Sequence, residues 1–303
     1  MVEPARITSV QNPRIKAVVR LVREHRERRA TGRFVAEGAR QIARALAAGL
    51  PLRELYECPA LPSAGAEIPW PQEADFAYFE VNAAVMGKMA YRQNPERLLA
   101  VFDQPSWPPE LPPEVSLGSL RDAGRTGPDP SPRVPGEAKS ELWLVAVGLT
   151  KPGNLGAMAR TAAAAGATGL IVADGVVDPF NPNAIHASTG AVFTLPILAG
   201  SSAQVIASLK ARGATPVALV VGATRPYHQV DLTRPIALII GAEDTGLDEA
   251  WRQAAQAHGH CVSIPMAPSC VDSLNASNAA AIVLFEAVRQ RNSVSSHRAD
   301  HQA

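Results

Sequence analysis

The chain has 303 residues, 47% of them hydrophobic, and a formal net charge of +1. This composition supports a full core, the length is typical of two domains, and the near-neutral charge excludes a global field that would attract nucleic acid or membrane. No apolar run is long enough to span a membrane and the first ten residues carry no apolar signal core, so we expect a cytoplasmic protein. Three cysteines without CxxC spacing and seven histidines without ligand spacing indicate neither a disulfide framework nor a metal site.

Positive charge is concentrated near the N-terminus. Between Arg6 and Arg44 lie eleven Arg or Lys and three Glu, a local net charge of +8 (eleven minus three). A helix is predicted after Asn12-Pro13, because apolar residues recur at helical spacing: Ile15, Val18, Val19 and Val22. A basic turn is expected at residues 26–33. An RNA-binding edge and a merely solvated helix face both remain open, and the candidate RNA contacts are Arg14, Lys16, Arg20, Arg23, Arg29 and Arg33.

The first hundred residues read as a small α/β domain. Strands are predicted from residue 34 and at 52–57, 77–80 and 97–102, and helices at 41–48 and 82–90. We therefore assign residues 1–103 to a first domain. Residues 104–140 hold nine of the 26 prolines without apolar periodicity, which predicts a mobile linker.

Beyond the linker, predicted strands and helices alternate. Strands are expected at 141–148, 169–172, 193–197, 216–221, 236–240 and 261–264, and helices at 156–165, 183–188, 204–212, 248–257 and from Asn275 onward, where Ile282, Leu284 and Phe285 are candidate buried residues. Continuous apolar strands such as IALII are typical of a parallel sheet buried on both faces. We predict a parallel α/β domain over 141–293 with a flexible tail at 294–303, and ligands at the carboxyl ends of its strands.

Two polar loops follow predicted strands. In the first, Asn154 precedes the helix that carries Arg160, and the helix is otherwise so apolar that we expect Arg160 to be buried and paired. In the second, Gly241 and Gly246 flank Glu243, where glycine permits positive φ or close approach of the backbone to a ligand. No GxGxxG or P-loop sequence occurs, which argues against dinucleotide and NTP binding.

A third loop leads into the last predicted helix. Ser273, Asn275 and Ser277 place short polar side chains where this helix begins. Such residues cap a helix, and free N–H groups at the same place also suit a ligand carboxylate or phosphate.

Together the three loops resemble the signature motifs of the SpoU (TrmH-like) RNA 2′-O-ribose methyltransferases. The matching segments are N-x-G-x-x-x-R-T-A from Asn154, IIGAEDTGL from Ile239, and IPM followed by SLNAS from Ile264, in that order. The N-terminal part resembles, more loosely, the L30e-like substrate-binding domain of many such enzymes, through NPRIK from Asn12 and the FVAEG segment from Phe34.

The resemblance implies a C-terminal α/β domain with a deep trefoil knot, a homodimer, S-adenosylmethionine as cofactor and RNA as substrate, with rRNA, most of all 23S rRNA, favoured over tRNA. Residue by residue it implies a cofactor site at Ile240, Gly241, Gly246, Ile264, Met266 and Leu274. It implies catalytic roles for Arg160, Asn154, Glu243, Ser273 and Asn275. The family commonly has an arginine where this chain has His186, which could alter a phosphate contact or only surface charge.

These residue types suit methyl transfer to a ribose hydroxyl. The hydroxyl is a poor nucleophile, so its proton must be accepted or the developing alkoxide stabilised. Arg160 suits the second task, whereas a guanidinium stays protonated in proteins and is a poor base, which leaves the base unassigned. A non-catalytic RNA-binding protein, a tRNA methyltransferase and an enzyme that protects the ribosome from an antibiotic remain alternatives.

Overall fold

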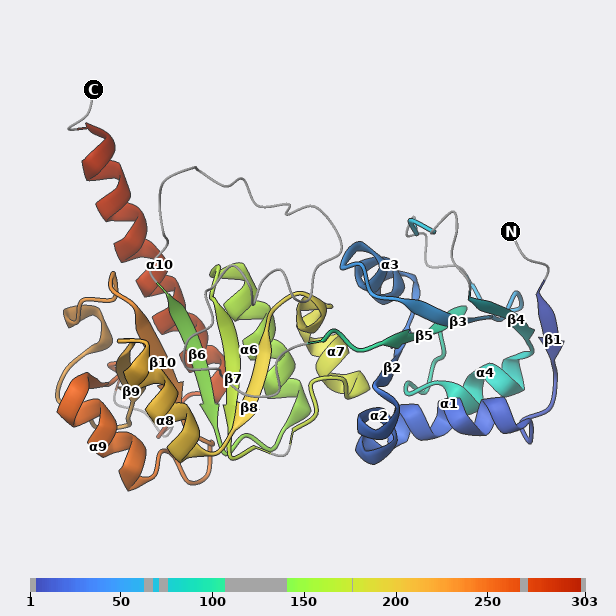
Figure 1. Cartoon of the computed structure of the whole chain (residues 1–303), viewed down its shortest axis with the longest axis horizontal. Helices are drawn as coiled ribbons and strands as arrows, with labels where there is room; N and C mark the ends of the chain where they lie inside the picture. Colours follow the sequence, from blue (N-terminus) through green and yellow to red (C-terminus); the bar gives the residue numbers. More distant parts are fainter. Residues whose placement is uncertain are drawn as a thin grey trace. The chain divides into compact units, whose positions relative to one another are not determined.

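The computed structural model of the chain describes residues 4–62, 68–70, 76–106, 141–175, 177–267 and 272–300, with the backbone alone for 294–300. The polypeptide divides into two compact units (Figure 1). Unit 1 contains the described residues up to Ser106 together with Asp178–Thr194, and unit 2 contains those from residue 141 to Val177 and from Leu195 onward. From residue 107 on, the predicted proline-rich linker lies outside the described residues.

Unit 1 contains a mixed sheet with the strand order β1-β4-β3-β5-β2. Its strands are β1 (Ala5–Ile7), β2 (Arg33–Glu37), β3 (Leu52–Glu57), β4 (Ala77–Val81) and β5 (Leu98–Asp103), and its N-terminal helices are α1 (Pro13–Arg23), α2 (His25–Thr31), α3 (Ala39–Ala47) and α4 (Ala83–Met89). β5 runs antiparallel to both of its neighbours. The predicted basic turn is wrong, because residues 25–31 form a helix that ends at Gly32, whose φ of 63° favours glycine.

The predicted helix after Asn12 is confirmed as α1. The Asn12 side chain caps it by accepting a hydrogen bond from the Arg14 N–H at 2.9 Å, and Pro13 occupies its first turn. Its buried side chains are Ile15, Val18, Leu21 and Val22, while Val19 is half-buried. This apolar face packs into the core of unit 1 and leaves the basic face of the helix outward.

Unit 1 also includes a segment that sequence analysis placed in the second domain. Asp178–Thr194 carries α7 (Pro182–Ser188) and the short helix η1 (Ala191–Phe193). The rings of Phe180 and Phe193 each lie 5.2 Å from that of Phe34. The strand predicted from Phe193 is therefore wrong at its start, because Phe193 is in η1 and the strand β8 begins at Ile197.

Unit 2 contains a six-stranded sheet with the order β11-β9-β10-β6-β7-β8, and every pairing is parallel. Its strands are β6 (Leu142–Val147), β7 (Gly169–Ala173), β8 (Ile197–Gly200), β9 (Thr215–Leu219), β10 (Ile236–Ile240) and β11 (His260–Val262). All residues of β6 and β10 are buried, which confirms the prediction of a parallel sheet covered on both faces.

Helices cover the two faces of this sheet (Figure 1). The helices of unit 2 are α6 (Pro152–Ala164), α8 (Ser202–Ala211), α9 (Glu249–His258) and α10 (Ala276–Asp300), with the short helix η2 (Tyr227–Gln229). α8 and α9 share a buried cluster with one face of the sheet, through Val205, Leu209 and Trp251. α6 and α10 pack together and contact β7 and β10.

The last helix differs from expectation in two ways. Leu284 is fully buried as predicted, but Ile282 is half-buried and Phe285 is 48% exposed. The buried stripe of α10 follows helical spacing through Ala280, Val283, Leu284 and Ala287, so Phe285 lies beside the stripe and not in it. α10 also continues to Asp300, past residue 293 where the sequence predicted a flexible tail to begin.

Candidate active site

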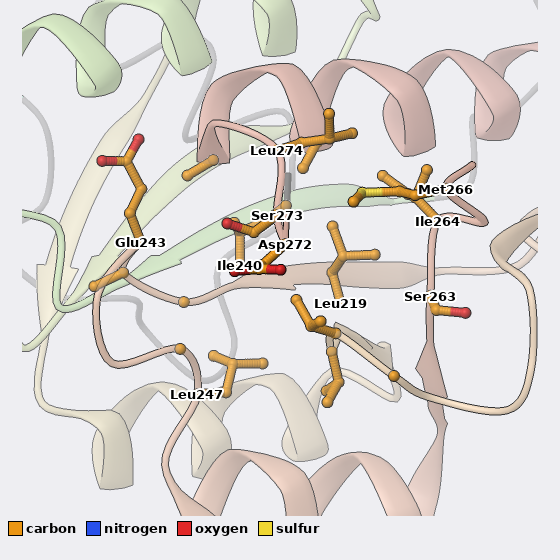
Figure 2. A pocket seen from close by; sticks show the side chains of 18 of the residues that line it. Leu219, Ile240, Glu243, Leu247, Ser263, Ile264, Met266, Asp272, Ser273 and Leu274 are labelled. Carbon is orange, nitrogen blue, oxygen red and sulfur yellow. The ribbon is translucent and has the colours of Figure 1, made fainter. Parts of the chain in front are cut away.

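A cavity of about 400 Å³ lies at the carboxyl edge of the unit 2 sheet. Because β9, β10 and β11 are parallel, the chain leaves all three at the same edge, the place where α/β sheets bind ligands. Figure 2 shows Leu219, Ile240 and Leu247 near the cavity together with Leu274 and Met266. The volume and the mainly apolar lining are typical of a small-molecule site.

All six residues predicted to bind a cofactor line this cavity. They are Ile240, Gly241, Gly246, Ile264, Met266 and Leu274. Sequence reasoning missed part of the wall, which is formed by Leu219, Val220, Val221, Gly222, Leu247, Arg252, Ser263 and Asp272. Residues 220–222 could have been found, because they lie at the carboxyl end of the strand predicted at 216–221, which is the ligand-binding edge of the sheet.

The two glycines of the second loop have different roles. Gly246 has a φ of 66°, which L side chains rarely adopt, and its N–H donates to the Ala242 carbonyl at 2.9 Å. At Gly241 a Cβ would lie 2.3 Å from the Gly246 carbonyl carbon and 2.7 Å from the Leu247 nitrogen. The close backbone approach at Gly241 is thus made by its own loop, which folds back at the end of β10.

Glu243 gathers side chains from all three loops. Asn154 Nδ2 donates to Glu243 Oε1 at 2.9 Å, and Asn275 Nδ2 donates to the same oxygen. Lys151 Nζ pairs with Glu243 Oε2, and Asn275 Nδ2 also lies 3.3 Å from Asn154 Oδ1. The structure therefore brings together Asn154, Glu243 and Asn275 as the sequence predicted, and adds Lys151, which the sequence analysis missed.

The environment of Glu243 favours its ionised form. The hydrogen bond from Lys151, followed by that from Asn154, lowers the pKa of the Glu243 carboxyl below its ordinary value of 4.5. The same contact raises the pKa of Lys151. Glu243 is consequently a fixed negative charge and hydrogen-bond acceptor near neutral pH, and it is not poised to exchange a proton.

Asn275 has a second role as the N-cap of α10. Its Oδ1 accepts hydrogen bonds from the Ser277 N–H at 3.0 Å and the Ser277 hydroxyl at 2.6 Å. Its amide nitrogen remains directed at Glu243, so one side chain fixes both the helix start and the polar cluster. Ser273 forms no hydrogen bond with this cluster in the described part of the chain. It lines the cavity, where Figure 2 shows it beside Asp272.

Arg160 differs from expectation. We expected it to be buried and paired, but it is exposed on α6, and no ion pair or hydrogen bond of its side chain is found within the described residues. The apolar character of the helix is accounted for by Leu155, Met158 and Ala159, which are buried on the opposite side. The guanidinium is therefore accessible from outside this chain.

Comparison with known proteins identifies the family of the chain. Residues 141–285 match the model of the SpoU rRNA Methylase family, and residues 12–100 match that of the MRM3-like substrate binding domain. A 23S rRNA (uridine(2479)-2′-O)-methyltransferase of Streptomyces viridochromogenes is 33% identical over 293 residues, covering 94% of this chain and 92% of the relative. The chain belongs to the SpoU rRNA methylase family.

Two crystal structures of RNA methyltransferases resemble nearly the whole chain. One, an RNA 2′-O ribose methyltransferase, has a TM-score of 0.71 and 39% identity, covering 94% of this chain and 99% of the other. The second is an AdoMet-bound rRNA methyltransferase from Sinorhizobium meliloti, with a TM-score of 0.73 and 29% identity, covering 94% of this chain and 97% of the other. The likeness extends over both units, which supports the prediction of a SpoU domain joined to a substrate-binding domain.

The six basic residues predicted to contact RNA fall into two groups in this SpoU protein. Arg14 pairs with Glu54, Arg20 with Glu27 at 3.5 Å, and Arg33 with Asp103 at 3.5 Å. The other three are exposed and form no ion pair within the described part of the chain: Lys16, Arg23 and Arg29. The second group therefore has positive charge that no ion pair among the described residues neutralises.

One basic residue of the same region has a structural role that sequence analysis missed. Arg28 is only 2% exposed, and its Nε donates to Asp178 Oδ2 at 2.5 Å. Its Nη1 donates to the carbonyls of Leu21 and Val22 at 2.6 and 3.0 Å, in the last turn of α1. Arg29, the next residue of α2, is exposed. The two arginines lie on different faces of the helix, so Arg28 is a buried structural residue and Arg29 faces solvent.

Two further features concern the described residues as a set. None of their helices combines the length and the apolar composition needed to cross a membrane. No group of three or more His, Cys, Asp and Glu side chains among them is arranged to hold a metal ion.

Proposed function

We propose that this SpoU family member transfers a methyl group from S-adenosylmethionine to a ribose 2′-hydroxyl of structured RNA, and that the RNA is 23S rRNA. The observation that carries the proposal is the polar cluster around Glu243, which joins the three motif loops beside the 400 Å³ cavity. The printed function of the Streptomyces relative, which is similar over nearly the whole chain, supports the choice of 23S rRNA.

The cavity fits the proposed cofactor by its chemistry. Apolar side chains such as Leu219, Ile264 and Leu274 would exclude water and pack on uncharged parts of the molecule, and the carboxylates of Glu243 and Asp272 suit its positive charges. When bound, S-adenosylmethionine supplies an electrophilic methyl group on a sulfonium centre. The residues predicted for this role are Ile240, Gly241, Gly246, Ile264, Met266 and Leu274.

The residues around the cavity would activate the ribose by position and charge. Glu243, held ionised, orients the amides of Asn154 and Asn275, which are then available as fixed dipoles. Arg160 is exposed and free to approach the ribose and its phosphate, where it would stabilise the developing alkoxide. Ser273, on the cavity wall, would complete the set by a hydrogen bond to the substrate.

We assign RNA capture to unit 1. Its match to a substrate-binding domain model supports this role, and the free cations Lys16, Arg23 and Arg29 supply the electrostatic contact with phosphates. The ion-paired members of the predicted set, Arg14, Arg20 and Arg33, would contribute less, because part of their charge is already neutralised.

We also propose that the enzyme acts as a homodimer in the cytoplasm, with the knotted backbone that the motif resemblance implies. The exposed apolar ring of Phe285 on α10 is suited to a subunit contact. Sedimentation equilibrium checks the dimer, and a monomer with full methyl-transfer activity would refute it.

The test is transfer of labelled methyl from S-adenosylmethionine to bacterial 23S rRNA that lacks this modification, followed by digestion to nucleosides. We expect label in a 2′-O-methylnucleoside, and we expect Arg160→Ala to abolish it while RNA binding is retained. Arg234→Ala, which also removes an exposed arginine of unit 2 but lies before β10, at the opposite edge of the sheet from the cavity, is the matched control and should leave transfer intact. RNA binding without any methyl transfer by the wild-type protein, on naked rRNA and on ribosomal particles, would overturn the proposal in favour of a non-catalytic RNA-binding protein.

A further inference from the structure

The wall of the unit 2 cavity carries a basic side chain that the proposed reaction does not use. Among the described residues that line this cavity, Arg252 is the only arginine, lysine or histidine. Lys151 and Arg160, the other cations near the three motif loops, do not line it. Within the described part of the chain, Arg252 is therefore the one cation that a ligand in the cavity would contact.

Arg252 is fixed beside the cavity by two backbone contacts. It lies near the start of α9, where its backbone N–H donates to the carbonyl of the N-cap residue Asp248 at 3.2 Å. Its side-chain Nε donates to the Leu247 carbonyl at 3.0 Å. Leu247 is only 4% exposed and also belongs to the cavity wall. The second contact therefore ties the guanidinium to a well-ordered part of that wall.

The two terminal nitrogens of this guanidinium are left for a ligand. Arg252 is exposed, and within the described residues its side chain forms no ion pair and no hydrogen bond beyond that of Nε. A guanidinium presents N–H groups in a planar fork that matches the two oxygens of an anionic group such as a carboxylate. The arrangement is thus suited to one anionic group of a ligand in the cavity.

The remaining charges on the wall have the opposite sign. Glu243 and Asp272 are the two carboxylates among the described lining residues. A ligand with several phosphates would be repelled by them, whereas a ligand that carries both signs of charge would fit. S-adenosylmethionine carries both, because its sulfonium and α-ammonium groups are positive and its α-carboxylate is its single negative group.

We propose that Arg252 binds the α-carboxylate of S-adenosylmethionine and makes the cavity selective for ligands that have this group. The inference rests on the proposed function and deepens it, since it assigns a residue of this chain to the amino-acid end of the cofactor. The sulfonium and the α-ammonium group are left to the carboxylates of Glu243 and Asp272. Arg252 then acts on cofactor affinity, and Arg160 acts on the ribose.

The test compares two ligands that differ only in the α-carboxylate. S-adenosylmethionine and its decarboxylated form are titrated into the full-length protein by calorimetry. We expect the wild type to bind S-adenosylmethionine roughly tenfold tighter, the effect of one charge-assisted contact at a partly exposed site. Arg252→Met keeps an unbranched side chain and should remove this preference by weakening S-adenosylmethionine alone. Arg252→Lys keeps the charge without the fork and should retain part of the preference.

Two controls accompany these titrations. Arg234→Met removes another exposed arginine of unit 2 that does not line the cavity, so both affinities should stay unchanged. S-adenosylhomocysteine keeps the α-carboxylate but lacks the sulfonium charge. Arg252→Met should therefore weaken S-adenosylhomocysteine and S-adenosylmethionine by the same factor.

Equal affinity of the wild type for S-adenosylmethionine and its decarboxylated form, or no binding of either, would overturn the proposal. Equal weakening of both ligands by Arg252→Met would overturn it in favour of a structural role at the Leu247 carbonyl. Unchanged affinity for both, with weaker RNA binding by the same variant, would assign the guanidinium to an RNA phosphate instead.

None of these measurements uses methyl transfer. A carboxylate preference that depends on Arg252, in a protein that transfers no methyl group, would reject only the proposed function. Methyl transfer by a protein whose carboxylate preference survives Arg252→Met would reject this inference alone.

Discussion

Removing the buried arginine of unit 1 should destabilise that unit selectively. Arg28→Met deletes the partner of Asp178 and leaves two carbonyls at the end of α1 without their donor. Both side chains of the ion pair are almost fully buried, 2% and 8% exposed, so solvent would not replace the lost contacts. Breaking a buried ion pair on one side costs about 3–5 kcal/mol, a large part of the stability of a domain.

The assay is hydrogen–deuterium exchange of the full chain, measured separately for each proteolytic peptide. Because each tenfold change corresponds to about 1.4 kcal/mol, exchange in peptides from α1 and α7 should rise roughly a hundred- to several-thousand-fold. Peptides from the unit 2 sheet serve as the internal reference. The matched control is Arg29→Met, which removes the neighbouring exposed arginine and should change exchange by little.

A double variant refines the test. Arg28→Met with Asp178→Asn leaves no unpaired buried charge, and the asparagine oxygen can still accept the Phe180 N–H that Asp178 now accepts at 2.8 Å. We expect it to be less destabilised than the sum of its single variants. If Arg28→Met and Arg29→Met gave the same exchange pattern, the structural role of Arg28 would be refuted.

Three further outcomes are expected in unit 2. Glu243→Gln should lower kcat for methyl transfer about tenfold or more by releasing the amides it orients, whereas Asp244→Asn, at an exposed neighbour, should not; equal losses would contradict this. Gly241→Ala should destabilise unit 2 by more than about 1–3 kcal/mol in urea unfolding, because the added Cβ would lie 2.3 Å from the backbone of its own loop. The control Gly87→Ala adds a Cβ in open space on a helix and should be neutral or stabilising. Because the folded-state pKa of Glu243 is depressed, its stabilising contribution is present above pH 4.5 and is lost as the pH falls through the folded-state value. The free energies of unfolding of wild type and Glu243→Gln should therefore converge on acidification. A difference that stays constant with pH would refute the assignment.

The architecture of unit 2 was predictable because its signal is local and repeated. A continuous apolar strand such as residues 236–240 is buried on both faces only when helices cover both sides of the sheet. The polar loops that follow parallel strands lie at one edge of that sheet. The order of strands and loops along the chain therefore places Glu243 and Asn154 at the same edge of the sheet. They lie within hydrogen-bond distance because β10 pairs with β6, a neighbour that chain order does not predict. It does not identify Lys151, because a lysine beside a proline is an ordinary loop residue unless its distant partner is known.

Errors arose where the composition of a segment did not show which of its side chains are buried. Arg160 lies in an apolar helix, yet helical phase turns it outward, and Phe285 lies beside the buried stripe of α10. The basic sequence around Arg28 has the composition of a solvated surface, and only the aspartate 150 residues away makes one of its arginines structural.

The grouping of Asp178–Thr194 with unit 1 has a consequence for exchanging modules between relatives. The chain enters this segment from β7 of unit 2 and returns to β8 of unit 2, after the rings of Phe180 and Phe193 have packed in unit 1. A chimera joined in the region between residues 106 and 141 would pair a foreign N-terminal half with the resident α7, leaving Phe180 and Asp178 without their partners. Grafting the N-terminal unit of one enzyme onto another should therefore succeed only when residues 178–194 are transferred with it.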